Sequence, residues 1–507
     1  MDTMESESEI GRFYSGQSVF ITGATGFMGK VLVEKLLRSC ESVGYIYVLL
    51  RPKKGLDVRS RLQEFVEGRC FDHLREIAPK ALNKVVPIEG DITLPGLGIS
   101  SAKLSLLVRD VSIVFHSAAT VKFDEPLKTS VNFNVLGTRR LIELCHKLPK
   151  IVTYYKYNNG KALIHVSTAY ANCNRYEVDE RLYPSDVSPQ KIIDLCEWMD
   201  EKLLNEMTPK LLGDRPNTYT YTKAMAETLL VEECGSLPVA IVRPSIVTCS
   251  WKEPMPGWVD NLNGPTGLIV AAGKGILRSM QHKSAASADI IPVDTVINLM
   301  IAIVWFTATQ RPNGILVYNC TSGSLNNFKW GQLSDMFQYL LQYPSSQIYR
   351  YPSLYLKESQ FFNRLHTVFD HIIPAHLFDA LMTVLGRKRI MVRIYERLHR
   401  SVKVLEWFTT HEWRFTNNNI LMLIDHLKGV DKQTFHFDIR TIHWPTYWGD
   451  YVLGTRKYIL KEDNSTLPEA RNNLRKLYYL NKIFGFLVLL GVWHTFSLGA
   501  VISAKLF

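Results

Sequence analysis

Cysteine is sparse in this chain of 507 residues and never occurs in a metal-binding spacing. No two cysteines form a C-x-x-C pair, and no cysteine–histidine spacing resembles a zinc site. We therefore expect no metal cofactor. The cysteines are interpreted as reduced thiols of a cytosol-facing protein, most of them filling core positions. They are Cys40, Cys70, Cys145, Cys173, Cys196, Cys234, Cys249 and Cys320.

Acidic residues are outnumbered by basic ones, 48 against 59, and the net charge is +11. This balance fits acidic ligands or an anionic membrane surface. No stacking-aromatic or basic-helix motif accompanies it, so we expect no nucleic-acid partner. The first residues lack a basic-then-apolar signal, which argues against secretion. A flexible segment is expected only over residues 1–11, and the length predicts two or more folded units.

Charge is absent from residues 483–503, a stretch of 21 residues near the end of the chain. This length suffices to cross a bilayer core of roughly 30 Å. The preceding flank is basic and aromatic, with Arg475, Lys476, Tyr478 and Lys482. We predict a C-terminal transmembrane anchor whose preceding domain faces the cytosol. A buried C-terminal helix and a two-pass or re-entrant hairpin stay open as alternatives.

Glycines recur at three-residue spacing directly after a short apolar run, Ser18 to Ile21. Gly23 permits a tight turn, Gly26 lets backbone amides approach a pyrophosphate, and Gly29 allows a helix to pack closely on the strand. Leucine and valine at helical spacing follow, and the N-terminus of such a helix binds anions. The pattern predicts a dinucleotide site rather than a plain turn. Its residues are Gly23, Ala24, Thr25, Gly26, Phe27, Met28 and Gly29.

The next apolar run, residues 45–50, ends in cations where an NAD site would place an acid. Arg51, Lys53 and Lys54 suit the 2′-phosphate of NADPH, although a solvated basic loop is the plain alternative. The following run, residues 85–88, ends in Gly90 and is followed by Asp91 and Ile92, which we assign to the adenine edge.

Strands at residues 112–115, 162–166 and 239–242 continue the alternation with helical patterns. This order predicts an α/β fold with a doubly wound, mostly parallel sheet, whose ligands lie at the carboxyl ends of the strands. Small residues after the fourth strand leave room for the nicotinamide ribose. The further cofactor-binding residues that we expect along this edge are Ala118, Ala119, Asn134, Pro244 and Ile246.

Tyr219 and Lys223 lie four residues apart at the start of a predicted helix and share one face. A nearby ammonium favours phenolate, so we expect Lys223 to lower the Tyr219 pKa toward working pH while it also holds the nicotinamide ribose. A hydroxyl of Ser167 or Thr168 would bind the substrate carbonyl oxygen, and we favour Thr168. Two further Y-x-x-x-K sequences, at Tyr157 and Tyr478, lie across a turn and beside the expected anchor.

Together these motifs resemble the extended short-chain dehydrogenases/reductases. More narrowly, residues 49–54, 241–245, 250–258 and 264–275 resemble the animal alcohol-forming fatty acyl-CoA reductases. The resemblance covers essentially the whole chain. It implies reduction of a fatty acyl-CoA by two NADPH to a primary fatty alcohol, with release of coenzyme A and without release of the aldehyde.

The resemblance also implies a domain organisation. We expect an NADPH-binding and catalytic domain over residues 12–355 and a mainly helical C-terminal domain over 356–480 that lines an acyl channel and lies against the membrane. The basic helix at residues 387–408 fits either a solvated face or a coenzyme A or lipid headgroup site.

Two other functions are weighed against this one. One is a membrane enzyme of the same superfamily that acts on a sterol or a sugar nucleotide, against which the block Trp251 to Pro254 counts. The other is a non-catalytic NADPH-binding scaffold, against which Tyr219 and Lys223 count. The sequence leaves open the acyl chain length, the oligomeric state, and the choice among endoplasmic reticulum, lipid droplet and peroxisome.

Overall fold

The computed structural model describes residues 8–52, 55–152, 162–185 and 187–506. The chain forms two compact units, each assembled from separate stretches. Unit 1 comprises Met1–Asp260, Ala286–Lys329 and His411–Tyr447, and unit 2 comprises Asn261–Ala285, Trp330–Thr410 and Trp448–Phe507. The domain boundaries expected from the sequence, residues 12–355 and 356–480, assume that each domain is one continuous stretch. These boundaries stay a prediction.

Unit 1 is built around a seven-stranded sheet in the order β11-β7-β5-β4-β1-β2-β3, with every neighbouring pair parallel. Its strands are rich in Val and Ile, and most of their residues are buried because helices cover both faces. This confirms the predicted doubly wound fold. The strands are β1 (Ser18–Thr22), β2 (Ile46–Leu50), β3 (Val85–Glu89), β4 (Val111–His116), β5 (Ala162–Val166), β7 (Val239–Pro244) and β11 (Leu316–Cys320).

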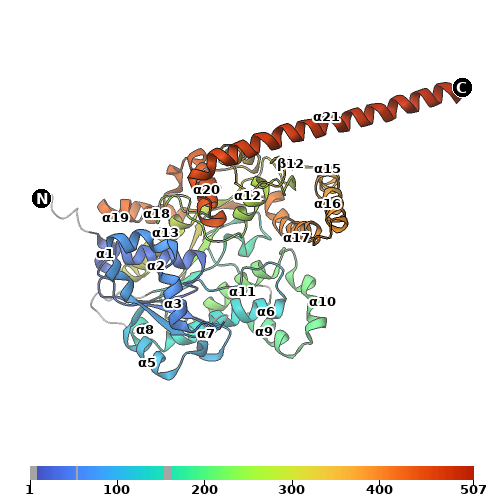
Figure 1. Cartoon of the computed structure of the whole chain (residues 1–507). Helices are drawn as coiled ribbons and strands as arrows, with labels where there is room; N and C mark the ends of the chain where they lie inside the picture. Colours follow the sequence, from blue (N-terminus) through green and yellow to red (C-terminus); the bar gives the residue numbers. More distant parts are fainter. Residues whose placement is uncertain (1–7, 53–54, 153–161, 186, 507) are drawn as a thin grey trace. The chain divides into compact units, whose positions relative to one another are not determined.

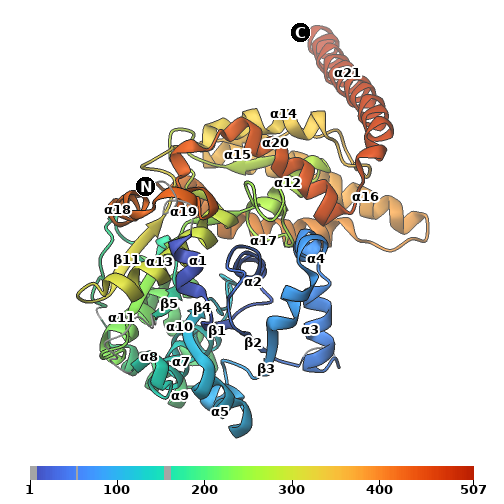
Figure 2. The same ribbon diagram turned by 90° about the vertical axis from the view of Figure 1, so that its left-hand side faces the viewer.

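Helices pack on both faces of this sheet (Figure 2). On one face lie α1 (Glu9–Tyr14), α2 (Phe27–Ser39) and α13 (Val293–Gln310), and on the other lie α5 (Ser101–Asp110), α7 (Gly137–His146) and α11 (Thr218–Glu233). The chain reverses its winding between β1 and β4, which are paired through Thr22 and His116. Such a switch point leaves a crevice at the carboxyl ends of the strands.

Residues 8–11 are more ordered than we expected, and residues 1–7 of the predicted flexible segment lie outside the described part of the chain. Residues 9–11 belong to α1, and Ile10 is fully buried. The Ser8 hydroxyl donates to Asp431 at 2.5 Å, which ties the start of the chain to a segment far along the sequence. A flexible N-terminus that includes residues 8–11 is therefore wrong, because the apolar side chain of Ile10 finds a place in the core.

Unit 2 is mainly helical, with one two-stranded parallel ladder of β9 (Ser279–Gln281) and β12 (Tyr355–Lys357). Helix α16 (Ile373–Val384) is followed by Gly386 with φ +67°, a conformation typical of a glycine that ends a helix. Its helices include α12 (Pro265–Gly273), α14 (Leu333–Gln342), α15 (Gln360–His366), the π-helical turn η7 (Thr367–Ile372), α16, α17 (Met391–Thr410) and α21 (Leu467–Leu506).

Two helical segments among the described residues are long and apolar enough to cross a membrane. The first, Val293–Gln310, is 89% buried and forms the core helix α13 of unit 1. The second runs over Asn464–Thr495, and none of the residues in its apolar 18-residue window is buried. All but its first three residues belong to α21, which extends away from the other helices of its unit (Figure 1). Its exposed apolar side chains do not fit a buried C-terminal helix.

Candidate functional site

The glycine loop after β1 is built for close backbone approach. A Cβ atom on Gly29 would lie 2.3 Å from the Gly23 carbonyl oxygen, so only glycine fits there. Gly23 has φ +78°, and a Cβ atom on it would lie 2.7 Å from the Ala118 nitrogen. Helix α2 starts at Phe27 with no acid in its first turn and no side-chain cap from Gly26. The loop and the helix N-terminus therefore fit a pyrophosphate.

A loop that follows β8 (Ile246–Thr248) is fastened beside this helix N-terminus. The Trp258 ring stacks on Phe27 with ring centroids 5.4 Å apart. Lys30 of α2 forms an ion pair with Asp260 at 2.7 Å. The loop therefore borders the start of α2, where the glycine loop ends.

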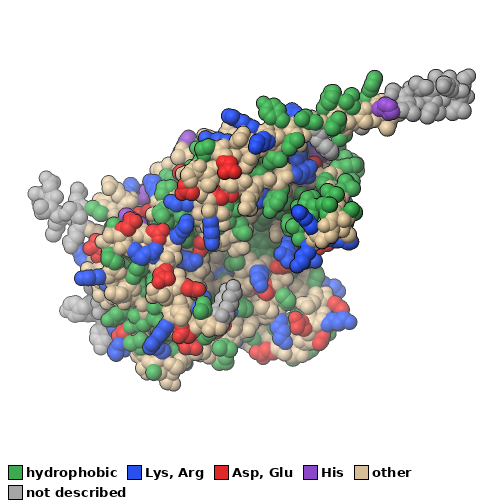
Figure 3. Space-filling view, viewed as in Figure 1, with side chains coloured by type: hydrophobic (Ala, Val, Ile, Leu, Met, Phe, Trp, Pro, Cys, Tyr) green, Lys and Arg blue, Asp and Glu red, His purple; other side chains and the backbone are tan. Residues whose placement is uncertain are grey.

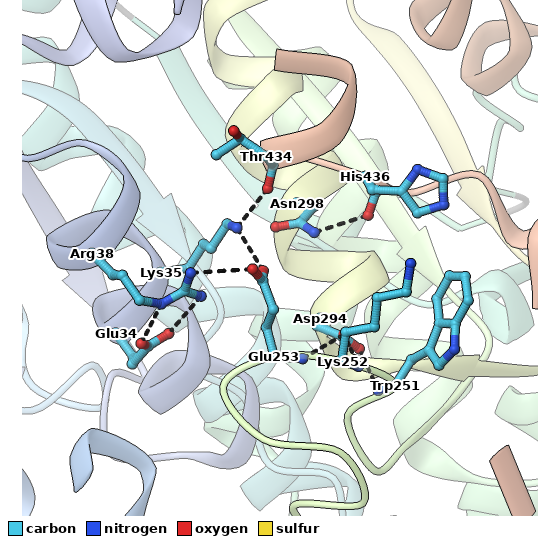
Figure 4. A network of polar contacts seen from close by, with 10 residues as sticks. All are labelled: Glu34, Lys35, Arg38, Trp251, Lys252, Glu253, Asp294, Asn298, Thr434 and His436. Carbon is cyan, nitrogen blue, oxygen red and sulfur yellow. Dashed lines mark hydrogen bonds and ion pairs between the residues drawn. The ribbon is translucent and has the colours of Figure 1, made fainter. Parts of the chain in front are cut away.

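Figure 4 shows how the block Trp251–Lys–Glu253 is held. The Asp294 carboxylate accepts hydrogen bonds from the backbone amides of these three residues at 2.8–3.0 Å. Glu253 pairs with Lys35 at 2.5 Å and with Arg38 at 3.1 Å, both on α2. From the sequence, this block was noted only because it resembles a known family. Its partners lie too far along the chain for spacing to reveal them.

A cavity of about 510 Å³ lies at the ends of β2 and β3. Arg51, Pro52, Glu89, Gly90, Asp91, Leu94 and Gly98 line it. The Arg51 guanidinium lies 3.4 Å from the Asp91 carboxylate, and its side chain is half exposed. Asp91 also accepts from the Thr93 amide at 2.9 Å, so its carboxylate is held in place. Lys53 and Lys54 lie outside the described residues.

The end of β4 joins the glycine loop through Thr22. The Ala118 amide donates to the Thr22 hydroxyl at 3.4 Å, and Ala119 follows it. Asn134 is buried in the π-helical turn η4 (Val131–Leu136); its side chain accepts from the Thr120 amide at 3.0 Å and donates to Thr222 at 2.9 Å. Asn134 therefore links the loop after β4 to helix α11.

Helix α11 begins beside the end of β5 and carries Tyr219 in its first turn. Asn217 caps this helix by accepting from the Thr220 amide at 2.9 Å. Burial raises the pKa of Tyr219 to about 12, and a side-chain hydrogen bond with Thr168 opposes that rise. The expected lowering of the Tyr219 pKa by Lys223 is wrong, because loss of water around the buried phenol is the main cause acting on this pKa and raises it. The Tyr219 phenol is therefore protonated at neutral pH.

Lys223 lies one turn further along α11 and is buried. Its ammonium donates to the Val166 carbonyl oxygen at 2.7 Å. Burial lowers the pKa of Lys223 to about 8, and the charge of Glu227 acts against this lowering. Lys223 is thus held at the carboxyl end of β5. Burial lowers the pKa of the nearby His116 to about 3, and the charge of Lys223 adds to this lowering, so His116 is neutral.

Ser167 and Thr168 have different partners. The Ser167 hydroxyl donates to Glu227 at 2.5 Å, and Glu227 forms an ion pair with the fully buried Arg243 at 2.6 Å. The Thr168 hydroxyl donates to the Pro244 carbonyl oxygen at 3.4 Å and interacts with Tyr219. Ser167 therefore belongs to a buried charged network with Glu227 and Arg243, whereas Thr168 contacts Tyr219.

The Glu227–Arg243 pair is the part of the site that the sequence analysis missed. Glu227 stands four residues after Lys223, so it shares its helix face, and this spacing was the available signal. Pro244 ends β7, and Ile246 starts the short strand β8, which pairs with β10 (Ile290–Pro292). All eight cysteines are buried and none forms a disulfide, which confirms their interpretation as core thiols. Among the described residues no cluster of His, Cys, Asp or Glu could hold a metal ion.

Comparison with known proteins matches this arrangement. Residues 21–300 and 370–462 match two family models, each described as male sterility protein. Fatty acyl-CoA reductase 1 of Xenopus laevis is 45% identical over 488 residues, which are 96% of this chain and 93% of that protein. The chain belongs to the fatty acyl-CoA reductase family. Fatty acyl-CoA reductase 1 of Homo sapiens is 44% identical over the same shares, and fatty acyl-CoA reductase 2 of Mus musculus is 42% identical.

Solved structures support the fold of this reductase family member. The reductase domain of a nonribosomal peptide synthetase from Mycobacterium tuberculosis superposes with a TM-score of 0.57 at 18% identity. It covers 90% of this chain and 96% of that domain. The terminal reductase domain of the myxalamid biosynthetic pathway gives a TM-score of 0.56, also at 18% identity. At this identity the likeness concerns the fold.

Proposed function

We propose that this protein reduces a long-chain fatty acyl-CoA to a primary fatty alcohol and releases coenzyme A, with NADPH as the cofactor. The observation that carries the proposal is the grouping of Tyr219, Lys223 and Thr168 beside a glycine loop, in a chain 45% identical to a fatty acyl-CoA reductase. Bound NADPH supplies a hydride for each of two reductions. The thioester is first reduced to the aldehyde, with loss of the coenzyme A thiolate, and the aldehyde is then reduced to the alcohol.

The cofactor residues fit a phosphorylated dinucleotide. The loop from Gly23 to Gly29, with Ala24, Thr25, Phe27 and Met28, would hold the pyrophosphate at the start of α2. Arg51 lines the cavity beyond β2 and would pair with the 2′-phosphate. Asp91 and Ile92 would border the adenine, and Ala118, Ala119, Asn134, Pro244 and Ile246 would border the nicotinamide half.

Tyr219 acts as the proton donor. Its phenol is protonated at neutral pH because its pKa is about 12, and it would donate to the carbonyl oxygen as negative charge develops there. The Thr168 hydroxyl would orient the Tyr219 phenol and would also hydrogen-bond the substrate carbonyl oxygen. Ser167 would support the site indirectly, because its hydroxyl donates to Glu227, which lies four residues after Lys223. Lys223 presents its ammonium to the ribose hydroxyls.

The apolar half of α21 anchors the protein in a membrane, as one pass with the catalytic unit on the cytosolic side. Its support is an uncharged stretch, residues 483–503, that directly follows the basic residues Arg475, Lys476 and Lys482, together with an apolar 18-residue window within Asn464–Thr495 that has no buried residue. An endoplasmic reticulum, lipid droplet or peroxisomal membrane would serve equally.

The test uses full-length protein in detergent with NADPH and acyl-CoAs of increasing chain length. Two NADPH oxidised for each coenzyme A released, with alcohol as the product, is the expected result. One NADPH per thioester, with free aldehyde, would contradict the alcohol-forming reaction. Binding of NADPH without turnover of any acyl-CoA would favour a sterol substrate or a scaffold.

A further inference from the structure

The helical stretch Gln360–Val384, which runs through α15, η7 and α16 of unit 2, has its polarity reversed. Its buried positions hold His371, Ala375 and Asp379, four residues apart. Its outward face holds large apolar side chains that are 54–85% exposed. This outward face consists of Phe361, Phe362, Phe369, Leu377, Leu381 and Val384. A helix on the surface of a water-soluble protein buries its apolar side chains and exposes its polar ones. The exposed apolar face of this stretch therefore indicates a surface that binds another apolar surface.

The polar residues of the inner side are fully used within unit 2. His371 accepts from the Arg278 amide at 2.9 Å. The Asp379 carboxylate accepts from the amides of Ile390, Met391 and Val392 at 2.9–3.1 Å and so caps α17. The orientation of the stretch is therefore fixed, and the apolar side chains cannot turn inward without breaking these bonds.

Both acids of the stretch point away from the outward face. Asp370 pairs with His366 at 2.9 Å and with Arg278 at 3.4 Å, and Asp379 is buried. The exposed charges that follow α16 are cations: Arg387, Lys388 and Arg389. Figure 3 shows hydrophobic side chains gathered over α16, with Lys and Arg side chains beside them. An apolar face with a cationic rim matches the interfacial zone of an anionic bilayer.

We propose that this outward face rests in the interface of an anionic phospholipid bilayer, as a second membrane contact besides α21. The face belongs to the same unit as α21, whose exposed apolar residues include Leu489. A protein partner would be expected to meet the cations with carboxylates, whereas a leaflet of anionic lipid meets the apolar face and the cations at once. The contact goes beyond the proposed reaction and does not depend on it.

The test places a fluorophore on single introduced cysteines of the full-length chain, in vesicles of phosphatidylcholine and phosphatidylserine. The native cysteines are all buried, so labelling favours the new one. Leu377→Cys reports on the outward face, Leu489→Cys on α21, and Leu203→Cys on an exposed leucine of unit 1. Phosphatidylcholine with a nitroxide at a shallow or a deep acyl position supplies the quencher.

We expect the Leu377 label to lose more fluorescence to the shallow nitroxide than to the deep one, since an interfacial helix lies about 5–10 Å into the boundary region. The Leu489 label should show the reverse order, and the Leu203 label neither. Omission of phosphatidylserine, or the variant R387Q/K388Q/R389Q, should reduce quenching at Leu377 but not at Leu489.

Quenching at Leu489 without quenching at Leu377 would overturn the proposal and leave the anchor standing. Quenching of the Leu377 label by a nitroxide on a second protein copy, but not by lipid, would overturn it in favour of self-association. Equal quenching at Leu377 with and without phosphatidylserine would overturn the assignment to an anionic surface.

Discussion

Replacing Lys223 by methionine should stabilise the protein while it abolishes turnover. The Lys223 pKa lies at about 8 against an ordinary lysine pKa of 10.5, because burial disfavours the charged form. Since one pKa unit corresponds to about 1.4 kcal/mol, the buried ammonium costs roughly 3 kcal/mol at neutral pH. Lys223→Met removes this cost with a side chain of similar volume, and it also loses the hydrogen bond to the Val166 carbonyl.

The pH dependence isolates this contribution. Between pH 8 and 10.5 the native state has released the Lys223 proton while the unfolded state still holds it. Stability of the wild-type protein therefore rises with pH across this window, and the variant lacks that rise. The stability advantage of Lys223→Met should shrink by roughly 3 kcal/mol from neutral pH to the upper end of the window.

The measurement is urea unfolding of full-length protein in detergent, followed by tryptophan fluorescence at several pH values. Lys30→Met is the matched control, since Lys30 forms a partly exposed ion pair with Asp260. Its effect should stay within about 1 kcal/mol and vary little with pH. A difference between wild type and Lys223→Met that does not change with pH would refute the reasoning.

Three further substitutions test the site. Arg51→Ala should weaken NADPH binding about tenfold or more and leave NADH binding unchanged, as measured by fluorescence titration; equal losses for both cofactors would contradict the 2′-phosphate role. Gly29→Ala should abolish binding of either cofactor, because its Cβ would lie 2.3 Å from the Gly23 oxygen; retained affinity would contradict close packing there. Glu227→Gln removes the charge that raises the Lys223 pKa, so the alkaline decline of kcat/KM should begin at lower pH, and an unmoved pH profile would contradict it.

The sheet was predictable because its strands are short apolar runs bounded by glycine or polar residues. Residues 45–50 and 162–166 needed only local pattern to be recognised, and they form β2 and β5. The glycine loop was equally predictable, since the close contacts of Gly29 are made with its own neighbours in sequence. Features that depend only on neighbouring residues can be predicted without knowledge of the fold.

Long-range partners were not predictable. Asp294 binds the amides of Trp251 and Lys252 across more than forty positions, and Arg243 meets Glu227 from a neighbouring strand. The Tyr219 pKa was misjudged for the same reason: the neighbouring Lys223 is visible in the sequence, whereas the burial that dominates is set by the whole unit. The assembly of each unit from separate stretches also depends on such contacts.

The central claim is that Tyr219 donates the proton in the reduction of an acyl-CoA. The most direct measurement compares Tyr219→Phe with Tyr221→Phe, a neighbour on the same helix, for NADPH oxidation in the presence of a long-chain acyl-CoA. Tyr219→Phe should lose about 10²- to 10⁴-fold in kcat with NADPH affinity retained, and Tyr221→Phe should lose far less. Equal activity of the two variants, with the same products as the wild-type protein, would contradict the account.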